Sequence, residues 1–176
     1  MFALRVVLGL LIAGQVAVAI LLWPELPARI PTHFGGDGSP DNWAAPDIEW
    51  FVISGVLALI GGGLGFVMPG VVDRLVGSDS ALLSVPDRER FSALPLPARL
   101  AAMWPVRVGV VVIGCELQVL TMFLLGGTYL VARGDWSGLP QVGLYGLMAL
   151  LLVTSTVIAV GSSRAVRREI AAAGVG

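Results

Sequence analysis

Four long apolar segments constrain the fold of this sequence more than any other feature. They cover residues 6–23, 50–68, 106–131 and 139–160. Each has roughly the 20 residues that an α-helix needs to cross the hydrocarbon core of a bilayer. The chain is 56% apolar and only 13% charged, which is too little charge for an ordinary water-soluble domain. We therefore predict an all-α integral membrane protein with four transmembrane helices.

The first two segments carry features that bear on how they are used. The first stands where a secretory signal peptide would lie, but its apolar core is long and no small-residue cleavage site precedes Trp23. We therefore expect a retained helix. The second contains four glycines between residues 61 and 65, and small residues let helices approach closely in lipid. We expect this helix to pack on a neighbour along its glycine face and to end at Pro69-Gly70.

These segments divide the chain into four parts. Residues 1–70 form a helical hairpin with a loop at 24–49, residues 71–105 a linker with one surface helix, residues 106–160 a second helical hairpin, and residues 161–176 a tail. Short loops rich in basic residues stay in the cytoplasm. Loop 24–49 has only Arg29 of the eleven arginines, and the third connection has only Arg133. We therefore expect both termini, the linker and the tail to be cytoplasmic, with loop 24–49 on the outer side.

Residues 26–43 are the most unusual stretch between the apolar segments. They hold three prolines, three glycines and the single histidine of the sequence. Prolines lack an amide donor and glycines readily take positive φ, so a continuous helix is excluded. We predict an ordered, turn-rich loop at the membrane surface.

A family resemblance is carried by this loop. Leu26-Pro27, Ile30-Pro31-Thr32-His33-Phe34, Gly38, Pro40-Asp41 and Trp43, directly after a spanning helix, resemble the N-terminal motif of the domain of unknown function 1648 (DUF1648). The domain is best known from SdpI-type bacteriocin-immunity membrane proteins. The resemblance covers roughly residues 10–65 and implies a multi-pass protein of the bacterial inner (cytoplasmic) membrane. It also implies, for one branch of the family, protection against a secreted peptide toxin and signalling to a cytoplasmic regulator.

The loop also supplies the candidate binding residues. They are Pro31, His33, Phe34, Asp37, Gly38, Asp41 and Trp43. His33, Asp37 and Asp41 follow one another at four-residue intervals, and with Glu25 or Asp47 they could surround a cation. One histidine without a second nitrogen or sulfur ligand is a weak zinc signature, so we predict no metal and expect these groups to bond to the loop backbone. A further alternative is a titrating His33 that senses external pH or holds a charged group of a peptide.

A second set of candidates lies inside the predicted bilayer. Glu116 stands near the middle of the third apolar segment, where a carboxylate is costly and usually faces the protein interior. Gln15 on the first helix and Thr154, Ser155 or Thr156 on the fourth are its candidate partners at comparable depth. We expect Glu116 to join helices by hydrogen bonding; the alternative is a proton or cation path.

No recognisable catalytic or cofactor motif is present, and we therefore predict a binding protein that is not an enzyme and holds no cofactor. A net charge of −1 gives no support for nucleic-acid binding. The leading interpretation is an SdpI-type protein that binds a secreted peptide toxin outside and a regulator inside. The alternatives are an accessory subunit that packs on a membrane protein partner and a small transporter that uses Glu116.

Overall fold

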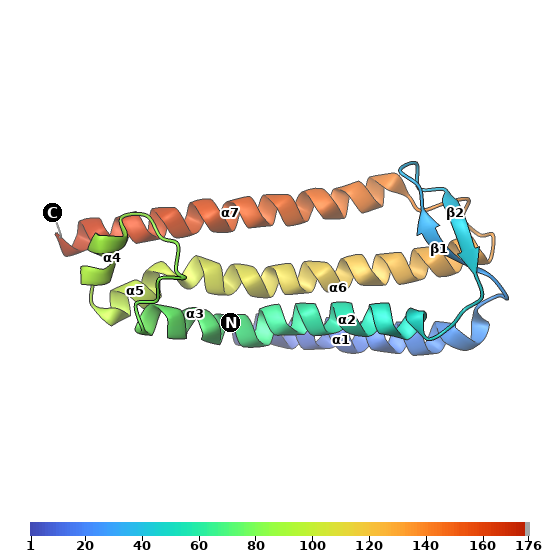
Figure 1. The fold of residues 1–176 in the computed structure, drawn as a ribbon, viewed down its shortest axis with the longest axis horizontal. Helices are drawn as coiled ribbons and strands as arrows, with labels where there is room; N and C mark the ends of the chain where they lie inside the picture. The colour runs from blue at the N-terminus through green and yellow to red at the C-terminus, as the bar shows by residue number, and fades with distance from the viewer. Residues whose placement is uncertain (175–176) are drawn as a thin grey trace.

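The computed structural model describes residues 1–174, and in this part of the chain it consists of helices and one β-hairpin (Figure 1). The elements are α1 (Phe2–Leu22), the 3₁₀ turn η1 (Trp23–Glu25), β1 (Ile30–Phe34), β2 (Pro40–Ala44), α2 (Glu49–Gly62), the π-helical turn η2 (Gly63–Val67), α3 (Met68–Gly77), α4 (Arg88–Ala93), α5 (Leu96–Ala102), α6 (Trp104–Ala132) and α7 (Gln141–Ala173). Four helical stretches within residues 1–174 are long and apolar enough to cross a membrane. The predicted four-helix membrane architecture is confirmed.

The four spans form an elongated antiparallel bundle (Figure 1). α6 lies between the α1–α2 pair on one side and α7 on the other, and it packs against all three. The β-hairpin and the turn between α6 and α7 lie together at one end of the bundle, which we call the hairpin end. The start of α1, the end of α7 and the short helices α4 and α5 lie toward the opposite end, which we call the helical end.

Close backbone approach holds α2 against α6. A Cβ atom on Gly114 of α6 would lie only 2.8 Å from the carbonyl oxygen of Gly61 on α2. One turn further along the second span, a Cβ atom on Gly65 would overlap the side chain of Leu8, which is fully buried. These glycines are therefore part of the packing surface, as predicted for the glycine face of the second span.

The predicted end of the second span at Pro69-Gly70 is wrong, because the helix continues through Gly77. Pro69 cannot donate the amide hydrogen bond that the carbonyl of Gly65 would receive in a regular helix. The wider turn η2 absorbs this defect. The freed Gly65 oxygen accepts a hydrogen bond from Arg5 Nε at 3.3 Å, so the proline is tolerated without breaking the helix.

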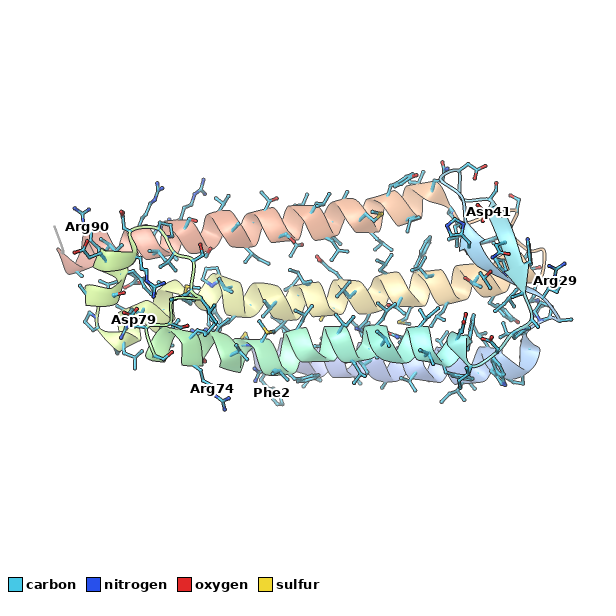
Figure 2. All side chains as sticks on the ribbon, in the orientation of Figure 1. Phe2, Arg29, Asp41, Arg74, Asp79 and Arg90 are labelled. Carbon is cyan, nitrogen blue, oxygen red and sulfur yellow. The ribbon has the colours of Figure 1, made fainter. Side chains whose placement is uncertain are left out.

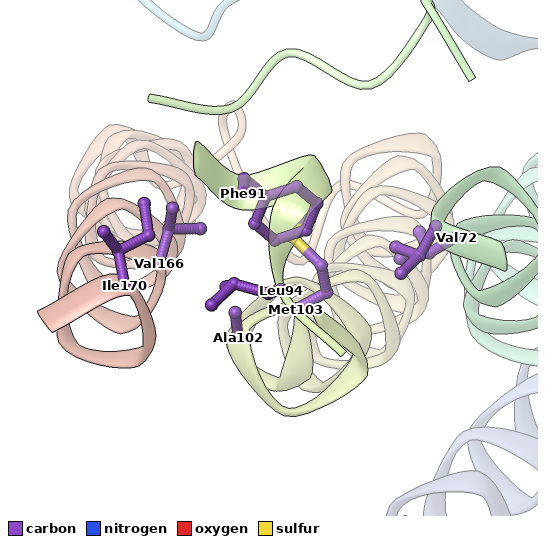
Figure 3. Close-up of a cluster of buried hydrophobic side chains, with 8 residues drawn as sticks. Val72, Phe91, Leu94, Ala102, Met103, Val166 and Ile170 are labelled. Atoms are coloured by element: carbon purple, nitrogen blue, oxygen red, sulfur yellow. The ribbon is translucent and has the colours of Figure 1, made fainter. Parts of the chain in front are cut away.

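The segment predicted as a linker with one surface helix is largely folded and contains two short helices. Phe91 of α4 is 1% exposed and contributes to a buried apolar cluster between α3, α5 and α7 (Figure 3). Ion pairs from Arg99 to Asp79 (3.8 Å) and from Arg107 to Asp73 (3.0 Å) join α3 and the loop after it to α5 and α6. The predicted tail is likewise helical through Ala173, and its last two residues, 175 and 176, lie outside the described residues.

Candidate ligand-binding site

The predicted turn-rich loop is a short antiparallel β-hairpin. Its register pairs Ile30 with Ala44 and Pro31 with Trp43, and it is interrupted by bulges around His33. The prolines explain the irregularity, because each removes one donor from the ladder of backbone hydrogen bonds. The chain reverses at a turn in which the Gly38 amide donates to the Gly35 carbonyl at 2.9 Å, and Gly38 takes a φ of 79°. Glycine is favoured there because larger residues rarely adopt this conformation.

The tip of the hairpin is attached to the second pair of spans. The amide of Leu139, in the turn between α6 and α7, donates to the Gly38 carbonyl at 2.9 Å. The Gly36 carbonyl accepts hydrogen bonds from Gln141 Nε2 (3.0 Å) and from the Tyr145 hydroxyl (2.9 Å), both on α7. A Cβ atom on Gly138 would lie 2.6 Å from the Gly38 oxygen, so only glycine permits this approach. The hairpin is therefore fixed at its tip.

The base of the hairpin is fixed by polar and apolar contacts. The Tyr129 hydroxyl on α6 donates to Glu25 Oε2 at 2.6 Å and accepts from Arg133 Nη1 at 2.7 Å. The buried indole of Trp50 donates to the Ala19 carbonyl at 2.9 Å and thereby joins α2 to α1. Ile30 packs in the same apolar cluster as Ala19 and Trp50, so β1 is attached directly to the helix ends.

Two of the three polar candidates on the hairpin meet each other. His33 Nδ1 lies 2.6 Å from Asp41 Oδ1, but both side chains are more than half exposed. Asp37 instead accepts a hydrogen bond from the Ser39 amide at 3.0 Å, and this bond lowers the pKa of the Asp37 carboxyl from its usual 3.8. Within residues 1–174, no three His, Cys, Asp or Glu side chains come close enough to hold a metal ion. The observed hydrogen bonds of these groups lie within the hairpin.

A pocket lies beneath β1, between the beginning of α2 and the half of α6 nearest the hairpin end. Its volume is about 270 Å³. β1 contributes Pro31 and Phe34 to the wall, and α2 contributes Trp50, Ile53 and Leu57. α6 supplies two leucines and two threonines, Thr121 and Thr128, and the Thr121 hydroxyl donates to the Leu117 carbonyl at 2.8 Å. Ligand pockets are typically apolar concavities with a few polar groups, so this arrangement is a candidate binding site.

The charged groups that line the pocket are both acidic. They are Asp47 and Glu49, which lie at the start of α2 and are exposed to solvent. Asp47 Oδ1 accepts a hydrogen bond from the Glu49 amide at 2.8 Å, and a carboxylate in this position also favours the start of a helix. The rim of the pocket is therefore negatively charged, whereas its floor is apolar.

Charge is strongly divided between the two ends of the molecule (Figure 2). The hairpin end carries six carboxylates (Glu25, Asp37, Asp41, Asp47, Glu49 and Asp135) and two arginines, a formal net charge of −4. The other nine arginines lie toward the helical end with five carboxylates, a formal net charge of +4. Arg29 and Asp41 mark the first end in the figure, and Arg74 and Arg90 mark the second.

The polar residues within the spans form three separate hydrogen-bonded pairs. Glu116 Oε1 accepts a hydrogen bond from the Thr154 hydroxyl at 2.6 Å, which joins α6 to α7. Gln15 is not its partner: Gln15 Nε2 donates to the Ser54 carbonyl at 2.7 Å and joins α1 to α2. Gln118 donates to the Leu57 carbonyl at 3.2 Å and joins α6 to α2. These residues connect all four spans by hydrogen bonds between neighbours.

The structure divides the seven candidate loop residues by role. Pro31 and Phe34 line the pocket. His33, Asp37 and Asp41 stabilise the exposed side of the hairpin, Gly38 docks on the α6–α7 turn, and the Trp43 carbonyl accepts from Arg29 at 3.1 Å. The prediction missed the contributions of Glu49, Trp50 and Thr121 to the pocket. Their signal in the sequence was weak, because acidic residues at a helix start and threonines in a span are common.

Together these features define a multi-pass membrane protein with a β-hairpin fixed over the ends of its helices. Residues 10–58 match the family model described as Domain of unknown function (DUF1648), which confirms the predicted resemblance. The match extends from within α1 through the hairpin to within α2. No match was found among curated proteins or among solved structures.

Proposed function

We propose that this chain is a binding protein of a bacterial cytoplasmic membrane and that its hairpin end captures a secreted peptide, as in bacteriocin immunity. The single observation that carries the proposal is the pocket between β1, α2 and α6. It lies where the family motif meets the helices, and four motif residues on β1 form part of its wall: Ile30, Pro31, Thr32 and Phe34. A function conferred by the motif is therefore expected to act through this pocket.

The way the hairpin is held supports binding. Its tip is bonded to α7 and its base to α6, so the pocket wall is ordered before a ligand arrives. A preformed wall lowers the entropy cost of binding. The lining offers apolar surface with three threonines and two carboxylates, which suits recognition of a peptide side chain.

The helical end supplies a surface for the proposed cytoplasmic regulator. Arg74, Arg90, Arg164, Arg167 and Arg168 form no ion pair within the described part of the chain. Under the positive-inside rule this end faces the cytoplasm. Free arginines there are suited to acidic protein surfaces and also to anionic lipids.

The proposal is tested by survival under peptide challenge. Susceptible bacteria that produce the chain are exposed to a panel of secreted bacteriocins, and their survival is compared with that of cells producing Ala45→Trp. Ala45 is an exposed residue at the pocket, so the indole is expected to obstruct the pocket without disturbing the helices. Protection by the parent and its loss in the variant, at equal membrane levels, is the expected result. Absence of protection throughout the panel counts against the immunity function.

A second candidate function, an accessory subunit of a larger membrane complex, is favoured by α7. None of the residues in its most apolar 18-residue window is buried within the described protein. Its contacts with the other spans are made with α6, so most of its circumference is free for lipid or a partner. The native mass of the protein in nanodiscs formed from its own membrane distinguishes the two functions. Stoichiometric copurification of another polypeptide supports the accessory role, and a bare monomer or dimer opposes it.

A further inference from the structure

We infer that the pocket binds a cationic amphipathic peptide segment, with an apolar side chain between α2 and α6 and a neighbouring positive residue against Asp47 and Glu49. This inference rests on the proposed function, since it names the chemical class of the peptide. It is carried by three observations: the size of the apolar pocket, the charge of its rim, and the charge of the whole hairpin end.

The pocket fits an amino-acid side chain better than a larger molecule. Its 270 Å³ lies just below the range of about 300–1,000 Å³ that is usual for small-molecule sites. The walls are formed by Trp50, Ile53 and Leu57 on one side and by leucines of α6 on the other. An aliphatic or aromatic side chain would remove this apolar surface from water.

The rim selects the charge of the residue beside that side chain. Asp47 and Glu49 are exposed, and no basic residue lines the pocket within residues 1–174. A lysine or arginine next to the inserted side chain would meet both carboxylates, whereas an acidic residue would meet like charge. Specificity for a cationic segment therefore follows from repulsion as well as from attraction.

The hairpin end as a whole favours the same ligand. Its net charge of −4 attracts a positive peptide over a distance comparable to the Debye length, which raises the rate of encounter at low salt. The apolar pocket then holds the peptide at short range. Long-range attraction and local recognition therefore favour the same sign of charge.

A phospholipid suits the pocket less well. The acyl chain of a phospholipid would find apolar walls, but every phospholipid carries a phosphate close to its chains. That phosphate would lie near Asp47 and Glu49 without a basic lining residue to compensate it. A peptide segment avoids this repulsion, because its positive residue can directly follow an apolar one.

The test uses three labelled octapeptides that alternate leucine with lysine, serine or glutamate. Binding is measured by fluorescence anisotropy on the full chain in phosphatidylcholine nanodiscs, with empty nanodiscs subtracted. We expect the leucine–lysine peptide to bind most tightly. The double variant Asp47→Asn with Glu49→Gln loses two exposed ion pairs with the peptide, so its affinity for the leucine–lysine peptide should fall about 2- to 30-fold. Ala45→Trp should weaken binding of all three peptides.

A charge-matched variant separates the rim from the general field. Asp37→Asn with Asp135→Asn removes two charges from the same end but none from the lining of this pocket. It should weaken the leucine–lysine peptide less than the rim variant does. Equal binding of the lysine and glutamate peptides overturns the inference, as does equal weakening by the two double variants. Loss of peptide binding when phosphatidylethanolamine replaces phosphatidylcholine would assign the pocket to lipid instead.

The outcomes also separate this inference from the proposed function. If the leucine–lysine peptide binds through the rim but Ala45→Trp leaves bacteriocin protection unchanged, the ligand class stands and the immunity function fails. If Ala45→Trp abolishes protection while the three octapeptides bind alike, the function stands and the inferred charge preference fails.

Discussion

The contact between Gly61 and Gly114 gives the sharpest prediction about stability. In Gly114→Ala, the new methyl group would lie 2.8 Å from the Gly61 carbonyl oxygen, a backbone atom that can retreat only if α2 shifts away from α6. Overpacking of this kind costs about 1–3 kcal/mol. Replacement of glycine by alanine in a helix also gains up to about 1 kcal/mol of helix propensity, which partly hides the cost.

A control in the same helix removes the propensity contribution. Gly126 also lies in α6, but a Cβ atom there would meet no heavy atom within 4 Å. The difference between Gly114→Ala and Gly126→Ala therefore isolates the packing cost of about 1–3 kcal/mol. For a protein of this size, that difference lowers the melting temperature by roughly 2–12 °C.

The measurement is thermal unfolding of both variants in the same nanodisc, followed by circular dichroism and by intrinsic tryptophan fluorescence. We expect Gly114→Ala to melt below the parent or close to it, and Gly126→Ala to melt at or above the parent. Coincident melting curves for the two variants would refute close α2–α6 packing at this depth, because both carry the same change in the same helix.

Three further predictions concern single interactions. Trp50→Phe removes a buried indole hydrogen bond and should lower the free energy of unfolding by about 0.5–1.5 kcal/mol in denaturant titrations. Trp104→Phe, at an exposed position without such a bond, should lower it less. A larger loss in Trp104→Phe than in Trp50→Phe contradicts the role assigned to Trp50. Thr154→Val should destabilise the bundle by around 0.6–2 kcal/mol, because it removes the hydrogen bond to Glu116. Glu116→Gln keeps an acceptor oxygen and should unfold like the parent. Loss of proton flux in a stable Glu116→Gln protein would instead support the transporter alternative. The pKa of Asp37 is lowered, so its hydrogen bond stabilises the hairpin above pH 3.8, and this stabilisation is lost as the pH falls through the pKa of the folded protein. An NMR titration of the carboxyl should give a midpoint below 3.8. A midpoint at or above 3.8 contradicts the turn geometry.

The spans and their small-residue face could be predicted from the sequence, because both are local properties. A run of about 20 apolar residues satisfies its backbone hydrogen bonds as a helix wherever it lies in a bilayer. The glycines between residues 61 and 65 indicated close packing, because small residues let neighbouring helices approach closely in lipid. The end of that span could not be predicted, since the helix continues past Pro69 through a π turn and the Gly65 oxygen bonds to Arg5, which is distant in sequence.

The hairpin could be predicted from the sequence only in part. Its prolines and glycines excluded a helix, and its motif predicted the family, which the match over residues 10–58 confirms. The strand pairing depends on an irregular register that no alternation of apolar and polar residues indicates. Its attachment to Tyr145 and Gln141 joins positions more than 100 residues apart, which local sequence patterns do not reveal.

The class of protein, the number of spans and the similarity of the N-terminal part to a family could therefore all be predicted, because hydrophobic length and a local motif are sufficient for each. Which groups meet depends instead on how distant parts of the chain pack: Glu116 with Thr154 rather than Gln15, His33 with Asp41 but not Asp37, and β1 with α2 and α6 around a pocket. Apolar helices can pack in many registers with a similar free energy in lipid. The choice among those registers rests on glycine contacts and buried hydrogen bonds between distant residues.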